Sequence, residues 1–234
     1  MIKKGESLED GISKSTPLLL VALEGNFLRA AEALFNRGAD VNGMAYDYPL
    51  MSYLIAHSPK PEITDMVKFL CKHGADVERR PVRSGYTPLM LAASKGRHQV
   101  VELLLSHGAN INARYIDPPG YGSSDQGATA LGFAAGAGHM PIVKLLLSKG
   151  ADVSLKKTNG YTPLIDALNL GHQEVAKILI ANKADVNAET IEHITPLKAA
   201  LREKNLQMAQ FLFDKGADVN ARNINGSTPL LAAV

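Results

Sequence analysis

The histidines are the first residues whose chemistry could define a function, because several imidazoles that converge on one point can bind a metal ion. His139 and His172 each follow a glycine and are 33 residues apart, and His73 and His107 each precede one. Metal ligands must meet within about 2 Å of one ion, whereas this even spacing places equivalent side chains in separate turns. We therefore expect structural roles and no metal site. The other histidines are His57, His98 and His193.

The single cysteine, Cys71, could act as a nucleophile with His73 as its base. It ends the apolar run Met-Val-Lys-Phe-Leu-Cys, however, at a place equivalent to Leu105 and Leu147 in later segments. A free cysteine commonly behaves as a small buried hydrophobic residue, so we expect it to pack in the core. One cysteine also excludes an intrachain disulfide and favours a reducing compartment.

Asp166 could serve as a general acid or base, but no second carboxylate falls at a spacing that would pair with it. We expect its carboxylate to be solvated or to face a partner. The glycine-rich segment Gly-Tyr-Gly-Ser-Ser-Asp-Gln-Gly lacks the lysine and the preceding strand of a phosphate-binding loop. The sequence therefore predicts no catalytic residue, no cofactor and no enzyme activity.

The composition is that of a globular protein. Of 234 residues, 46% are apolar and 21% charged, which argues against disordered or collagen-like chains. Twenty-five lysines and arginines against 23 acidic residues give a net charge of +2, too small a field to gather polyanions. No stretch approaches the ~20 apolar residues that span a bilayer. We expect a cytoplasmic protein that binds neither nucleic acid nor membrane.

A repeat organises almost the whole chain. The segment Gly-Tyr-Thr-Pro-Leu recurs with close variants, and each copy is followed by an apolar stretch and by a variant of Gly-Ala-Asp-Val-Asn. The last four marker positions are 33 residues apart, and the irregular gaps before them indicate insertions in loops. The marker positions are Thr16, Tyr48, Thr87, Thr129, Thr162, Thr195 and Thr228.

One unit predicts two helices. Thr162 can cap a helix that starts at Pro163, and the Gly-His pair at 171–172 ends it after about two turns. The apolar residues at 175–180 are too continuous for a solvated helix. Lys183 holds the place of a helix-ending glycine, so we expect it to have a positive φ. Neither helix can bury its apolar face within one unit, so neighbouring units must stack.

These motifs resemble the ankyrin repeat family, whose pattern joins Thr-Pro-Leu-His-x-Ala, a Gly-His turn, an apolar helix and Gly-Ala-Asp-Val-Asn-Ala. The resemblance covers about residues 15–234. It implies an all-α solenoid of stacked helix-turn-helix units with projecting β-hairpin-like turns, in which the first helices and the turns line a concave side. The expected parts are a lead-in at 1–14, repeats at 15–46, 47–84, 85–126, 127–159, 160–192 and 193–225, and a partial repeat at 226–234.

Several segments depart from the family's pattern. Tyr48 and Ala130 interrupt the Thr-Pro pair, and loss of a helix cap typically costs ~1 kcal/mol. Extra residues lie around 57–64 in the second repeat and in the Pro- and Gly-rich turn at 114–127, which is either functional or mobile. The chain ends at Val234 within the first helix of a seventh repeat, so we expect a fragment of a longer protein.

The resemblance also implies a binding surface, formed in ankyrin proteins by turn residues and by variable positions of the first helices. Tyr86, Tyr121, Tyr161 and Phe133 are the expected anchors, and the alternative is that these rings pack on adjacent turns. Basic residues of the middle repeats would suit an acidic partner segment. The implied partner-binding residues are Arg83, Tyr86, Tyr121, Phe133, Lys157, Tyr161, Asp166, Asn169, Leu170, Ile194 and Arg202.

The function that the resemblance implies is protein–protein interaction. We expect a monomer that binds another protein through the concave and turn-tip surface of the middle repeats. An alternative is the substrate-targeting or regulatory arm of a longer enzyme or effector whose catalytic domain lies beyond residue 234. A third hypothesis is a small-molecule or nucleotide site on the concave face.

Overall fold

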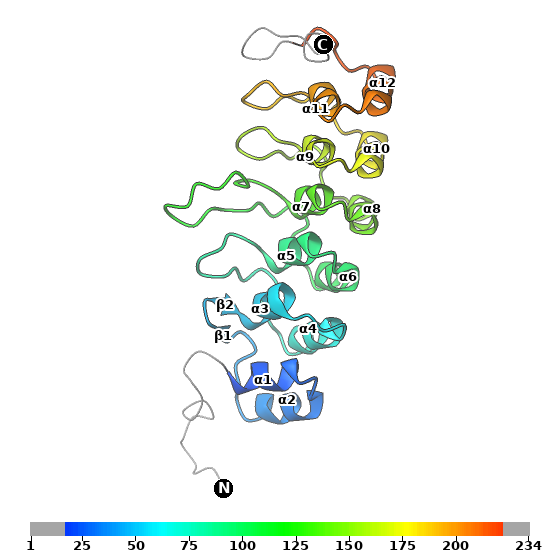
Figure 1. Cartoon of the computed structure of the whole chain (residues 1–234). Helices are drawn as coiled ribbons and strands as arrows, with labels where there is room; N and C mark the ends of the chain where they lie inside the picture. Colours follow the sequence, from blue (N-terminus) through cyan, green and yellow to red (C-terminus); the bar gives the residue numbers. More distant parts are fainter. Residues whose placement is uncertain (1–16, 222–234) are drawn as a thin grey trace.

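The computed structural model describes residues 17–221, and within that range twelve helices form six pairs (Figure 1). The described part is therefore the expected all-α solenoid, whereas the lead-in at 1–14 and the partial repeat at 226–234 lie outside it. Its one strand pair is β1 (Met44–Ala45) with β2 (Tyr48–Pro49), antiparallel. The helix pairs are α1 (Leu18–Glu24) with α2 (Leu28–Phe35), α3 (Leu50–His57) with α4 (Ile63–Lys72), α5 (Pro88–Ser94) with α6 (His98–Ser106), α7 (Ala130–Gly136) with α8 (Met140–Ser148), α9 (Pro163–Asn169) with α10 (Gln173–Ala181), and α11 (Pro196–Arg202) with α12 (Leu206–Asp214).

Four of the marker threonines cap the first helix of their pairs. The hydroxyl of Thr162 accepts a hydrogen bond from the N–H of Ile165 at 3.2 Å, and Thr87 and Thr195 do the same in their pairs. Thr129 also keeps its cap. The expectation that Ala130 costs the fourth repeat a helix cap is therefore wrong, because the threonine alone supplies the acceptor.

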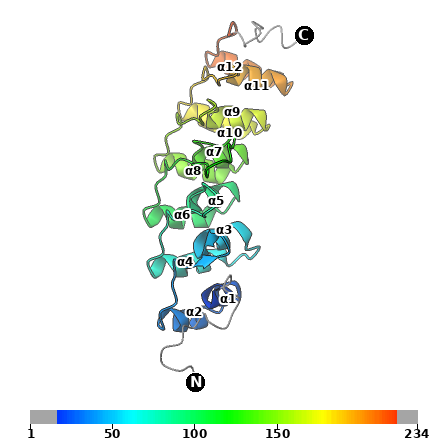
Figure 2. The same cartoon turned by 90° about the vertical axis from the view of Figure 1, so that its left-hand side faces the viewer.

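The pairs stack along one axis, and from α3 to α11 each odd-numbered helix lies between a projecting turn and an even-numbered helix (Figures 1 and 2). We call the odd-numbered helices with the projecting turns the inner face, and the even-numbered helices the outer face. Equivalent leucines of the outer helices are fully buried and form part of one continuous core. They are Leu70, Leu104, Leu146, Leu179 and Leu212. The core thus runs through the interfaces between pairs, as stacked repeats require.

The end of α10 confirms the prediction made for Lys183. This residue has a φ of 69°, while Gly150 and Gly216 have φ values of 87° and 89° at the equivalent places. The sequence therefore keeps a left-handed residue here at a local cost of roughly 1 kcal/mol.

A row of hydrogen bonds links successive projecting turns. In three turns an asparagine Oδ1 accepts a hydrogen bond from a backbone N–H of the next turn. Ser154 holds the equivalent position in the fourth turn and instead donates its hydroxyl to Asp152 of its own turn at 2.6 Å. The row is therefore interrupted between the fourth and fifth repeats. The asparagine pairs are Asn42 with Asp76, Asn112 with Asp152, and Asn187 with Asp218.

Candidate functional site

The long turn at 114–127 is held by its own hydrogen bonds and by the next repeat. The N–H of Tyr115 donates to the carbonyl of Ala128 at 2.7 Å, and the N–H of Gly127 donates back to Tyr115 at 2.9 Å. At the far end, the side-chain amide of Asn159 donates to the carbonyl of Ser124 at 3.3 Å. The inserted residues therefore have defined positions on the inner face and bring new side chains to it.

Three aromatic rings pack together at the base of this turn. The ring centroid of Tyr86 lies 4.8 Å from that of Tyr115 and 4.9 Å from that of Phe133. Tyr115 and Phe133 lie edge to face at 6.1 Å. Such pairs stabilise by roughly 0.5–1.5 kcal/mol beyond burial alone. Tyr86 and Phe133 thus pack against neighbouring rings, and both side chains stay partly exposed.

An ion triad lies beside the aromatic cluster. The ammonium of Lys157 is 3.0 Å from Asp125 Oδ1 and 3.1 Å from Asp166 Oδ2. The side chains of Lys157 and Asp166 are only 14% and 12% exposed, and that of Asp125 is 31% exposed. Lys157 also lies 6.0 Å from the ring centroid of Tyr161. Two successive turns and helix α9 thus meet at one partly desolvated lysine.

Burial and charge shift the pKa values of these groups. Burial raises the pKa of Asp166 above its usual value, although the Lys157 ammonium opposes this shift. Burial alone would lower the pKa of Lys157, but the carboxylates of Asp166 and Asp125 outweigh it and the pKa is raised. Burial, with the nearby Asp125 carboxylate, raises the pKa of Tyr86 to about 12. The triad therefore holds a charged lysine at neutral pH.

The expectations for Asp166 need correction. Its carboxylate is buried and ion-paired rather than solvated, and a second carboxylate, Asp125, shares its lysine. The sequence spacing did not indicate Asp125, because this residue lies 41 residues before Asp166, inside the inserted turn. Only the way in which this turn folds back on the next repeat brings the two carboxylates together.

The implied binding residues divide by exposure. Tyr121 and Leu170 are exposed apolar side chains, at 63% and 61%, and Arg83 and Arg202 are exposed basic ones. Asp166 is buried. The other implied binding residues are partly buried: Tyr86, Phe133, Lys157, Tyr161, Asn169 and Ile194.

His139, His172 and Cys71 have structural roles. His139 contacts the carbonyl of Ser94 at 3.1 Å and His172 that of Gly136 at 3.0 Å, so each ring links its turn to the preceding helix pair. Cys71 is buried, and burial raises its pKa to about 11. In the described range no three His, Cys, Asp or Glu side chains are grouped as a metal site would need.

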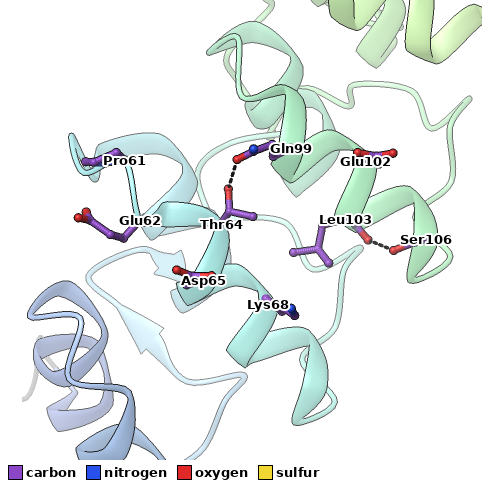
Figure 3. Close-up of a pocket in the computed structure, with 9 residues that line it drawn as sticks. All are labelled: Pro61, Glu62, Thr64, Asp65, Lys68, Gln99, Glu102, Leu103 and Ser106. Atoms are coloured by element: carbon purple, nitrogen blue, oxygen red, sulfur yellow. Dashed lines mark hydrogen bonds between the residues drawn. The ribbon is translucent and has the colours of Figure 1, made fainter.

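A groove between α4 and α6 lies on the outer face (Figure 3). Thr64 and Gln99 approach each other across it at 3.3 Å. Its charged residues are of both signs, Glu62, Asp65 and Glu102 with Lys68. The groove is the space between adjacent outer helices.

A family model for ankyrin repeats matches residues 18–115, 117–190 and 132–223. The chain belongs to the ankyrin repeat family. The crystal structure of the human ASB11 ankyrin repeat domain has the same fold, with a TM-score of 0.76, 25% identity, and coverage of 93% of this chain and 91% of that one. Ankyrin repeats are general protein–protein interaction modules, and this chain carries such a domain. Among residues 17–221 no helix combines the length and the apolarity needed to cross a membrane.

Curated relatives match shorter stretches of the ankyrin repeat region. A putative ankyrin repeat protein of Fowlpox virus is 41% identical over 64 residues, which is 27% of this chain and 19% of that protein. The human ankyrin repeat and SOCS box protein 6 is 35% identical over 107 residues, 45% of this chain and 24% of that protein. The chain thus spans about a fifth to a quarter of the length of these relatives.

Proposed function

We propose that this ankyrin repeat domain binds a partner protein through the inner face of its third to sixth repeats. The observation that carries the proposal is the pair of exposed apolar side chains there, Tyr121 on the long turn and Leu170 at the end of α9. Tyrosine is enriched at binding hot spots, and Leu170 adds exposed apolar area on the same face.

The surrounding contacts support a preformed surface. The aromatic cluster and the Lys157 triad hold the long turn against its neighbours, so little ordering is needed on binding. A rigid surface loses less conformational entropy than a flexible one. Tyr121 and Leu170 are therefore the proposed contact residues, while Tyr86 and Phe133 support them.

The test compares the partner affinity of three alanine variants, two on the inner face and one on the outer face. A partner is captured from native lysate and purified, and its affinity is measured for Tyr121→Ala, for Leu170→Ala and for Leu206→Ala. Leu206 is 71% exposed on the outer helix α12, so it is a matched control for Leu170. We expect the inner-face variants to lose more than about 1 kcal/mol of binding free energy and the control to lose none. Equal losses at Leu170 and Leu206 would contradict the proposal.

The hypothesis of a targeting arm for a longer enzyme or effector remains a second proposal. Sequencing the native reading frame past Val234 tests it, and a catalytic domain there is the result it requires.

A further inference from the structure

A second groove adjoins the one shown in Figure 3, where the inserted residues of the second repeat reach the start of α6. Its volume is about 430 Å³. Because Pro61, Thr64 and Gln99 line both grooves, the two form one continuous groove that follows α4 and α6. We call the part beside the insertion around 57–64 the basic end, and the part drawn in Figure 3 the acidic end.

The basic end has cations and no carboxylate. Lys60 and Arg97 line it together with His98, and none of its described lining residues is acidic. Within residues 17–221 neither Lys60 nor Arg97 forms an ion pair. Lys60 donates a hydrogen bond to the carbonyl of Glu24, which does not neutralise its charge. This end of the groove therefore has a net positive charge.

Arg97 differs from the residues at the same place in the next two helix pairs. There His139 and His172 contact carbonyls of the preceding pair, whereas Arg97 donates through Nη2 to the carbonyl of Ser58 in the insertion at 2.5 Å. Its Nε is buried without an acceptor, and its Nη1 forms no hydrogen bond with the part of the chain that the structure describes. A partly buried cation with unfilled donors is costly, and an anion in the groove would offset that cost.

The start of α6 adds to this positive field. The helix begins at His98 with no side-chain cap and with no acidic residue in its first turn. The positive end of its dipole is therefore uncompensated, and Gln99 and Val100 of this turn line the basic end.

The acidic end has the opposite charge. Glu62, Asp65 and Glu102 line it with Lys68 as the one cation, and none of the four forms an ion pair within the described range. Arg97 and Glu102 are five residues apart along α6, about 7.5 Å at the rise of a helix. Two residues of an extended chain span roughly 6.8 Å, and their side chains point to the same face. An extended segment in the groove can therefore present one side chain to each end.

From this charge pattern we propose that the groove is a second binding surface, separate from the inner face. It receives an extended segment of a partner protein that has an aspartate or glutamate at the basic end and a lysine or arginine about two residues away at the acidic end. The carboxylate can accept from the guanidinium of Arg97 and pair with Lys60, while the basic side chain lies near Glu102. A segment with the reversed order would meet like charges at both ends.

The experiment selects short random peptides, displayed on phage, against the whole chain. We expect the enriched peptides to share an acidic residue with a basic residue about two positions away. Isothermal titration with one such peptide should show an affinity about tenfold lower for Arg97→His, which carries the residue that the next two repeats have at this place. Lys144→Ala is the control, because Lys144 is an exposed cation on the outer helix α8, and its affinity should be unchanged.

Two further measurements separate binding from folding. Lys60→Ala changes an exposed side chain, so it should weaken binding several-fold and leave the melting temperature unchanged. A peptide whose acidic residue is replaced by its amide should bind the wild type and Arg97→His equally, because the coupled charge is gone. Glu102→Gln tests the basic residue of the peptide in the same way.

Three results would overturn the inference. One is a set of enriched peptides without a shared acidic residue, and another is an affinity that neither Arg97→His nor Lys60→Ala changes. The third is an equal loss in Lys144→Ala, which would indicate a general attraction to exposed cations. Peptides that lose binding only in Tyr121→Ala or Leu170→Ala would also overturn it, and they would leave the proposed function standing.

Discussion

Lys157 and Asp166 are nine residues apart in the sequence, and their charged atoms lie 3.1 Å apart. The ion pair fastens the turn that precedes α9 to the helix itself. Because the same ammonium contacts Asp125, it also fastens the inserted turn of the preceding repeat. One lysine therefore fixes the inner face at the centre of the proposed binding surface.

Replacement of Lys157 by Met should destabilise the domain. It leaves two partly buried carboxylates without a counter-ion, and loss of one partner from such a group costs roughly 3 kcal/mol. Urea unfolding at neutral pH measures the loss. The neighbouring Lys156 is exposed, so Lys156→Met should change the unfolding free energy by less than about 0.5 kcal/mol. Similar losses for both variants would contradict the role of Lys157.

Lowering the pH should stabilise the folded protein through protonation of Asp166. Its folded pKa is raised above the ordinary value of 3.8, so the folded protein binds its proton more tightly than the unfolded chain does. The stability that this gives is present below that ordinary value and is lost as the pH rises through the folded pKa. The stability of the wild type relative to Asp166→Asn should therefore increase as the pH is lowered from neutral, and a constant difference would contradict the shift.

The interrupted row of turn hydrogen bonds gives a matched pair of variants. Asn112→Ala removes a hydrogen bond between repeats and should cost about 1 kcal/mol of unfolding free energy. Ser154 holds the same position one turn later and bonds only within its own turn. Ser154→Ala should cost less than half as much in thermal or urea unfolding. A larger loss of unfolding free energy for Ser154→Ala than for Asn112→Ala would contradict the stabilising role of the Asn112 hydrogen bond.

Tyrosine substitutions should separate packing from contact residues. Tyr86→Ala removes a ring from the aromatic cluster and should lower the unfolding free energy by about 2–3 kcal/mol. Tyr121→Ala removes an exposed ring and should leave stability within about 0.5 kcal/mol while weakening partner binding. A stable Tyr86 variant would show that the cluster does not support the turn.

Cys71 should react with alkylating reagents only when the chain unfolds. Its thiol is buried and its pKa is raised to about 11, so the reactive thiolate is scarce at neutral pH. Mass spectrometry after brief iodoacetamide treatment should show an unmodified native protein and a modified protein in urea. Rapid labelling of the native protein would contradict the burial.

Sequence spacing predicts the elements of this fold well, because each unit carries its own helix signals. Thr162, Pro163 and the residues that end the helix act locally, and Lys183 follows from its place in the repeat. The Asp125 contact could not be predicted in this way, since an insertion has no counterpart in other units. The same holds for Phe133, whose half-buried state depends on rings from two other turns.

Hydrogen–deuterium exchange of the whole chain, with and without its purified partner, tests the central claim most directly. The account predicts new protection in the turns at 114–127 and 154–161 and in α7, α9 and α11, because these segments form the inner face of the middle repeats. Protection confined to the outer helices, such as the groove between α4 and α6, would contradict it.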